Sequence, residues 1–236
     1  MIDITRFDAV SLDVYGTVLD WEPEITSILQ QWVSAAGRAI DREVLLSAYD
    51  RIRQPLQDER PALQYPDVLK RTLERMGDEF GMAVPTDLLE RFSGIAATHK
   101  PFADSVGALH DMRSMGLKLA ALSNIDDRSF ATAMTSAGIE FDVVVTAQRV
   151  GAYKPDPAHF WAALSDLRAM GVPMQRTLHV AQSRRADIVV ANAIGLTSVW
   201  VNRPGHAFGR TDRGAEDAKP DYTANSLSHV VDMLRG

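Results

Sequence analysis

The sequence contains no cysteine, no long hydrophobic run and no excess of basic residues. Without cysteine, the chain can form no disulfide, no thiolate metal site and no cysteine nucleophile. No apolar run approaches the roughly 20 residues of a membrane-spanning helix, so we expect no membrane association. Segment 1–8 lacks the basic and apolar regions of a signal peptide. Together these absences predict a cytoplasmic protein.

Basic residues are also too few and too scattered to follow a phosphate backbone. The chain has 25 Lys and Arg against 31 Asp and Glu, which gives a net charge of −6. Nucleic-acid binding normally requires a clustered excess of positive charge. We therefore expect no nucleic-acid partner and a small-molecule substrate instead. With 236 residues, 46% of them hydrophobic, the chain is long enough to bury a full core.

Short apolar runs alternate with helical patterns along most of the chain. Such alternation is typical of a mostly parallel sheet covered by helices. The predicted strands are 7–14, 118–124, 141–147, 177–183 and 198–202. Segment 203–221 is polar and predicts a long surface loop.

A long helical region separates the first two predicted strands. Apolar residues recur at helical spacing over 21–97, and no strand pattern interrupts them. The simplest organisation is an α/β fold with a Rossmann-like parallel-sheet core, made of 1–20 and 98–236. A helical cap, 21–97, is inserted after the first strand. An insertion in this place can act as a lid over the strand ends.

Polar residues follow the predicted strands. Asp13 ends the first strand, Ser123 and Asn124 end the second, Lys154 follows the third and Asp187 follows the fourth. Ligands of open parallel sheets bind beyond the carboxyl ends of the strands, so these groups form a candidate active site. Each residue also has a structural interpretation: the two acids as helix caps, Ser123 and Asn124 as turn residues, and the lysine as a solvated charge.

The motifs at these strand ends resemble those of the haloacid dehalogenase superfamily. They are DVYGT (13–17), SN (123–124), YKPD (153–156) and the acid after the fourth strand, in this order and with a helical insert after the first. The pattern is most similar to the (S)-2-haloacid dehalogenase (type II) group, because VWVNR (199–203) and KPDYTANSL (219–227) also resemble segments of that group. The resemblance covers essentially the whole chain.

This resemblance implies a hydrolase that acts on a small 2-substituted carboxylic acid, with a 2-haloacid as the simplest substrate. It implies that Asp13 attacks the carbon bearing the halogen and forms an ester, which water then hydrolyses. It assigns substrate binding or orientation to Thr17, Ser123 and Asn124, charge balance to Lys154 and assistance to Asp187. It also implies a homodimer.

Tyr15 stands two residues after the predicted nucleophile, where phosphatases of this superfamily carry a second aspartate. That aspartate protonates a departing alkoxide, which is a poor leaving group. A halide needs no proton, and a tyrosine with a usual pKa near 10 is a weak acid at neutral pH. Tyr15 therefore favours dehalogenation and is expected to form a rigid wall of the substrate site.

The sequence departs from the dehalogenase pattern at several positions. The group carries a halide-binding arginine early in the insert, and here Arg51 is the candidate for substrate binding, with Arg53 as the neighbouring choice. Phe160 replaces a tyrosine that the group places six residues after the lysine. These departures leave room for another small acid, such as one with a strained ring, opened by the same attack. Of the six histidines, only His99 lies at the junction between insert and core.

We expect no metal or other cofactor. The fourth motif has Gln182 where a magnesium-dependent phosphatase would supply an acid, and Arg184 and Arg185 beside it add positive charge. Two alternatives to a dehalogenase stay open. One is a magnesium-dependent phosphatase of the same superfamily, and the other is a catalytically silent member that binds a small acid or serves as a subunit of an assembly.

Overall fold

The computed structural model describes residues 1–206 and 214–236. Its main feature is a six-stranded parallel sheet in the order β5-β4-β1-β6-β7-β8. The strands are β1 (Ala9–Asp13), β4 (Lys118–Ser123), β5 (Val143–Thr146), β6 (Thr177–Ala181), β7 (Ser198–Val201) and β8 (Tyr222–Ala224). The predicted parallel α/β sheet is therefore confirmed, with a sixth strand that the sequence patterns did not indicate.

The central strand β1 is buried along its whole length. Val10 and Leu12 point into the larger hydrophobic cluster on one face of the sheet, whereas Ala9 belongs to a second cluster on the other face. Continuous burial of this kind is typical of parallel strands that are covered on both faces. The register pairs Asp13 with Leu122, so the carboxyl ends of β1 and β4 lie at one edge of the sheet.

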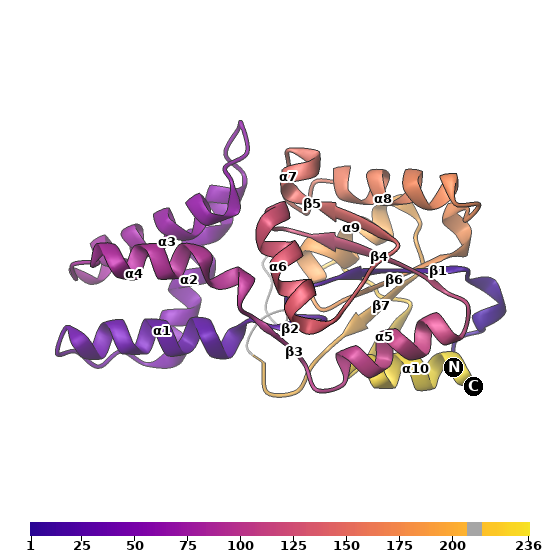
Figure 1. Cartoon of the computed structure of the whole chain (residues 1–236), viewed down its shortest axis with the longest axis horizontal. Coiled ribbons are helices and arrows are strands. Elements are labelled where there is room, and N and C mark those ends of the chain that lie inside the picture. The colour runs from indigo at the N-terminus through magenta and orange to yellow at the C-terminus, as the bar shows by residue number, and fades with distance from the viewer. Residues whose placement is uncertain (207–213) are drawn as a thin grey trace.

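Helices cover both faces of the sheet (Figure 1). The larger cluster contains residues of α5 (Ser105–Ser114), α6 (Asp127–Ala137) and α10 (Leu227–Arg235). The second cluster contains residues of α8 (Ala158–Ala169) and α9 (Val189–Ile194), and the short helix α7 (Ala147–Val150) follows β5. In this way the apolar positions of these five helices meet one face of the sheet or the other.

The predicted insert forms four helices that stand beside the sheet as a separate group (Figure 1). They are α1 (Glu22–Ala35), α2 (Arg42–Gln57), α3 (Tyr65–Phe80) and α4 (Thr86–Gly94), followed by the 3₁₀ turn η2 (Ile95–Ala97). An unpredicted antiparallel pair, β2 (Leu19–Asp20) with β3 (Lys100–Pro101), joins the two chain segments that connect this group to the core. That the group acts as a cap stays a prediction.

Three short turns complete the described chain: η1 (Ile4–Arg6), η3 (Met174–Arg176) and η4 (Arg184–Ile188), a π-helical turn. Part of the predicted loop 203–221 lies outside the described residues, namely 207–213. In the described part, Ala215 and Ala218 are buried and pack with Ala181 and Ile188. Among the helices that the structure describes, none is both long and apolar enough to cross a membrane.

Candidate active site

Asp13 lies at the end of β1 with its carboxylate almost completely buried. The Thr17 hydroxyl donates a hydrogen bond to Asp13 Oδ2 at 2.6 Å and accepts one from the Gln182 backbone N–H at 2.8 Å. The turn between them requires Gly16, whose φ is +104° and whose position leaves a Cβ only 3.0 Å from Gln182 Oε1. The DVYGT segment thus aims the Asp13 carboxylate beyond the strand and fixes one of its oxygens.

Lys154 is buried between two carboxylates. Its ammonium donates to Asp13 Oδ1 at 2.9 Å, to Asp187 Oδ1 at 2.7 Å and to the Leu122 carbonyl at 2.8 Å. These three bonds use all three ammonium protons. Since only 1% of the side chain is exposed, Lys154 is not the solvated loop charge that the sequence left open.

Asn124 holds the backbone of Lys154 in place. Its side-chain oxygen accepts a hydrogen bond from the Lys154 N–H at 2.7 Å, and its amide donates to the Lys154 carbonyl at 3.0 Å. The two bonds join the end of β4 to the YKPD segment. Asn124 also lines the cavity described below, so it both positions the lysine and faces any ligand.

Asp187 lies on η4 and is completely buried. The N-cap of this turn is Ser183, whose hydroxyl accepts from the Ala186 N–H at 3.0 Å, so Asp187 does not cap it. His179 Nε2 lies 3.3 Å from Asp187 Oδ1, and both side chains are completely buried. The fourth motif therefore places a second carboxylate against the ammonium that binds Asp13.

The two carboxylates differ in their proton affinity. Burial raises the pKa of Asp13, and Lys154 counteracts that rise only in part. Burial also acts to raise the pKa of Asp187, but Lys154 and the neighbouring His179 outweigh it, so this pKa lies below its usual value. Burial acts to lower the pKa of Lys154, but the two carboxylates outweigh it and raise that pKa. The lysine is accordingly a permanent cation near neutral pH.

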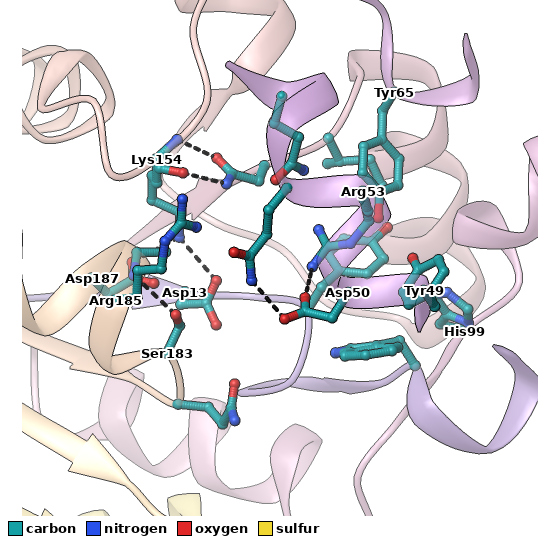
Figure 2. Close-up of a pocket in the computed structure, with 18 residues that line it drawn as sticks. Asp13, Tyr49, Asp50, Arg53, Tyr65, His99, Lys154, Ser183, Arg185 and Asp187 are labelled. Carbon is teal, nitrogen blue, oxygen red and sulfur yellow. Dashed lines mark hydrogen bonds and ion pairs between the residues drawn. The ribbon is translucent and has the colours of Figure 1, made fainter. Parts of the chain in front are cut away.

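A cavity of about 110 Å³ lies in front of Asp13, between the strand ends and α2. Figure 2 shows Asp13, Lys154, Asp187 and Arg185 on the core side, and residues of the helical group on the other. The cavity suits a small molecule of a few heavy atoms. The cavity lies at the carboxyl end of β1, where the strand order reverses, since β4 and β5 lie on one side of β1 and β6, β7 and β8 on the other. This is the usual ligand position in such sheets.

Tyr15 forms one wall of this cavity, as the sequence predicts. Its hydroxyl donates a hydrogen bond to the Ala96 carbonyl at 2.9 Å, and burial raises its pKa well above the usual value near 10. His99 packs edge-on against the Tyr15 ring, 5.8 Å between centroids, and its Nδ1 lies 2.7 Å from Glu24 Oε2. The junction residue His99 thus belongs to the cavity wall.

Arg51 does not take the predicted substrate-binding position. It lies on the outer face of α2, where 56% of its side chain is exposed and it binds Glu79 at 2.7 Å. Arg53, two residues further on, lines the cavity instead. Two residues turn an α-helix by about 200°, so a small error in alignment moves a side chain to the opposite face.

Other predicted residues lie around the cavity without lining it. Thr17 binds Asp13 through its hydroxyl. Ser123 is buried, and its Oγ has no hydrogen-bond partner among the described residues. Phe160 packs in the core at 4.8 Å from the His179 ring. Arg184 Nη2 donates a hydrogen bond to the Ala215 carbonyl at 2.9 Å.

The sequence analysis missed the residues that the helical group contributes. The cavity-lining residues that it did not name are Trp21, Tyr49, Asp50, Gln54, Gln57 and Tyr65, besides Ile125, Ser183 and Ala186. Five positions of α2 line the cavity, 49, 50, 53, 54 and 57, and they follow helical spacing. Polar residues at this spacing usually mark a solvated helix face, so the pattern gave no signal of a site.

Fold and site together define an α/β protein of the Rossmann-like class, with a cavity between the sheet and an inserted helical group. The sequence model of the haloacid dehalogenase-like hydrolase family matches residues 7–195. The chain belongs to this family of hydrolases. The matched region includes every residue of the Asp13, Lys154 and Asp187 cluster.

The sequence identity to individual relatives is low, about one residue in four. The chain is 25% identical to an (S)-2-haloacid dehalogenase of Pseudomonas sp. (strain YL), over 95% of this chain and 93% of that one. It is 24% identical to a glyceraldehyde 3-phosphate phosphatase of Methanocaldococcus jannaschii, over 85% and 83%. A crystal structure of an L-2-haloacid dehalogenase superposes with a TM-score of 0.78 at 25% identity, covering 97% of this chain and 99% of the other.

The superfamily includes magnesium-dependent phosphatases, so the fit of a magnesium ion matters. Magnesium prefers a near-octahedral set of oxygen ligands. Here the facing oxygens of Asp13 and Asp187 both bind the Lys154 ammonium, and Gln182 stands where an acid would add a ligand. Within 1–206 and 214–236, no cluster of three or more His, Asp or Glu side chains is arranged for a metal. These donors do not fit a magnesium ion.

Proposed function

We propose that the protein hydrolyses a small 2-substituted carboxylic acid, in the simplest case a 2-haloacid, through an ester at Asp13. The observation that carries this proposal is the state of the Tyr15 hydroxyl. It donates its proton in a hydrogen bond to the Ala96 carbonyl, and burial raises the pKa of Tyr15. A leaving group at this site receives no proton from residue 15. Two further observations support the same reaction. A relative of this chain is named (S)-2-haloacid dehalogenase. Two buried carboxylates, Asp13 and Asp187, bind the Lys154 ammonium.

The first step is a displacement at carbon 2 of the substrate. A carboxylate oxygen of Asp13 forms a bond to this carbon, and the halide leaves with the electron pair of the broken bond. Thr17 donates to Asp13 Oδ2 and Lys154 donates to Oδ1, so both oxygens are held in fixed directions. Lys154 also reduces the repulsion between the Asp13 anion and the substrate carboxylate.

The second step regenerates Asp13. Water adds to the carboxyl carbon of the ester, the bond from that carbon to the oxygen on substrate carbon 2 breaks, and the oxygen of the water stays in Asp13. Asp187 Oδ2 has no hydrogen-bond partner among the described residues, so it can accept one proton of this water and pass it to the departing oxygen, which leaves as the hydroxyl of the 2-hydroxy acid. The second proton of the water passes to solvent as the Asp13 carboxylate re-forms. The homodimer that the family resemblance implies stays a prediction.

A substrate panel tests the proposed function. We expect halide release from 2-chloropropanoate or 2-bromopropanoate in excess chelator, at the same rate as with magnesium, because Lys154 already supplies the cation beside Asp13. We expect turnover of p-nitrophenyl phosphate to stay near background. Magnesium-dependent phosphatase activity above that on any haloacid would instead support the alternative to which the phosphatase relative points. Binding of these acids without turnover would support a catalytically silent member.

Substitution Tyr15→Phe separates the two leaving-group chemistries. Because a halide needs no proton, we expect kcat for a 2-haloacid to stay within about tenfold of the unmodified protein. Loss of a needed general acid would cost roughly 10²- to 10⁴-fold. The variant leaves the Ala96 carbonyl without its donor, which should lower stability by about 1–3 kcal/mol. Steady-state kinetics measures the change in kcat, and thermal unfolding of the same samples measures the change in stability. Together they distinguish loss of a proton donor from loss of packing around residue 15.

A further inference from the structure

One face of α2 presents polar side chains to the cavity, and the proposed mechanism does not use them. We call Asp50, Arg53, Gln54 and Gln57 the polar face of α2. All four line the cavity, and their spacing of three, four and seven residues places them on one side of the helix. Figure 2 shows Asp50 and Arg53 across the cavity from Asp13. A simple 2-haloalkanoic acid would turn its alkyl substituent toward these polar groups or toward the core.

The polar face is a fixed arrangement. Arg53 Nη2 donates to Asp50 Oδ1 at 2.8 Å, and Gln54 Nε2 donates to Asp50 Oδ2 at 2.6 Å. The Arg53 guanidinium also lies 5.3 Å from the centroid of the Tyr49 ring. The exposed fractions are only 17% for Arg53 and 23% for Asp50, well below those of a surface ion pair. A ligand that enters the cavity therefore meets an ordered, partly buried ion pair.

Two donors of this face lack an acceptor. Arg53 Nε and the Gln57 side-chain nitrogen are buried and have no hydrogen-bond partner among the described residues. A buried donor without an acceptor costs roughly 1–3 kcal/mol, so a turn of either side chain that brings its donor to an acceptor on a ligand would stabilise the complex. An alkyl group against the same donors would leave them unpaired and remove water from the ion pair.

The charges of the cavity limit what this substituent can be. The lining contains three carboxylates and three cations, namely Asp13, Asp50, Asp187, Arg53, Lys154 and Arg185. Asp50 and Arg53 already neutralise each other at 2.8 Å, so a second carboxylate or an ammonium group on the substrate would meet one like charge together with an opposite charge that already has a partner. The like charge repels it in a partly buried site. A neutral group that both donates and accepts hydrogen bonds meets neither penalty.

We propose that the polar face of α2 selects 2-substituted acids whose carbon 3 carries a neutral hydrogen-bonding group, a hydroxyl or a carboxamide. This inference rests on the proposed function, because it places carbon 2 of the substrate at Asp13. The acceptor of the substituent binds the Arg53 guanidinium or the Gln57 amide. Its donor binds the Asp50 carboxylate or the Gln54 side-chain oxygen.

An isosteric pair of substrates tests the selection. We expect kcat/KM for 2-chloro-3-hydroxypropanoate to exceed that for 2-chlorobutanoate by about 10- to 100-fold, since the two differ only by a hydroxyl in place of a methyl group. The charged analogues 2-chlorosuccinate and 3-amino-2-chloropropanoate should both be poorer than the hydroxyl compound. Equal rates for the isosteric pair, or a better rate for either charged analogue, would overturn the inference.

A double variant assigns the preference to its residues. Asp50→Leu with Arg53→Met replaces the ion pair by apolar side chains and should bring the ratio for the isosteric pair below one. Arg51→Met is the matched control, because Arg51 lies on the outer face of α2 and binds Glu79 outside the cavity. It should keep the original ratio. If the double variant does not fold, the kcat/KM ratio of the isosteric pair, measured on the unmodified protein, still tests the inference.

Binding of the two reaction products separates failure of this inference from failure of the proposed function. Calorimetry should show 2,3-dihydroxypropanoate binding at least about tenfold more tightly than 2-hydroxybutanoate, whether or not any haloacid is turned over. Tighter binding of the diol acid without halide release would overturn the proposed function and keep the selection. Halide release with no preference in either assay would keep the function and overturn the selection. Absence of both would overturn the two together.

Discussion

Substitution Asp13→Asn is expected to reduce halide release by at least on the order of 10³-fold and to leave the fold intact. An amide is a far poorer nucleophile than a carboxylate, and the substitution keeps the size of the side chain. The amide oxygen of Asn can accept from either the Thr17 hydroxyl or the Lys154 ammonium, and the other group loses its acceptor. Steady-state halide release and circular dichroism on the same preparation measure the two effects.

The covalent step itself has a more direct test. Single turnover in heavy-oxygen water should place the first label in Asp13, because water adds to the carboxyl carbon of the ester and leaves one oxygen there. Mass spectrometry of the peptide that contains residue 13 detects this label. Asp8→Asn, at the other end of β1 and paired with Arg176 at the surface, is the matched control and should keep normal activity. Label that enters the product directly and never the protein would contradict the ester mechanism.

The sheet and the cluster at its edge could be predicted because local sequence encodes both. Strand and helix periods differ, so the alternation of apolar runs identified five of the six strands. Parallel strands bring their carboxyl ends to one edge, which is why Asp13, Lys154 and Asp187 could be grouped from far apart in the chain. The strand β8 spans only Tyr222–Ala224, too short for its period to be recognised.

The side of the cavity made by α2 could not be predicted in the same way. Which residues of α2 face Asp13 depends on the rotation of this helix about its own axis, and packing of its apolar residues against the other helices sets that rotation. For this reason the structure places Arg51 outside the cavity, although the sequence made it the candidate, and places Arg53 in the cavity lining. The short pair of β2 with β3, which joins the two connections between the helical group and the core, also left no periodic signal.

Lys154 links the stability of the core to the chemistry of the site. Its ammonium is the shared partner of Asp13 and Asp187, both of which are buried. In the Lys154→Met variant these carboxylates face one another without a cation, so the pKa of each should rise. Two like charges about 4 Å apart repel by about 4 kcal/mol at an effective dielectric constant near 20, which corresponds to roughly a 10³-fold loss of activity.

Stability should fall as well, by about 3–5 kcal/mol near pH 7, because one partner of a buried ion pair is removed. In the unmodified protein, the lowered pKa of Asp187 contributes stability above its unfolded value of 3.8, and this contribution is lost as pH falls. The raised pKa of Lys154 contributes stability that is fully present below its unfolded value of 10.5. The deficit of the variant should therefore shrink toward pH 4, where its carboxyl groups bind protons and cease to repel.

Urea unfolding of both proteins at pH 7.5 and at about pH 4.5 measures this difference, alongside halide release. Lys118→Met is the control, since Lys118 is 47% exposed and lies 3.4 Å from Asp142 at the surface. A pair with one exposed partner contributes only about 1 kcal/mol, with little effect on turnover. A Lys154→Met protein with near-normal activity, or with the same deficit at both pH values, would show that the two carboxylates do not depend on this ammonium. Charge balance at Asp13 would then have to come from Arg185 or Arg53, the other cations of the cavity.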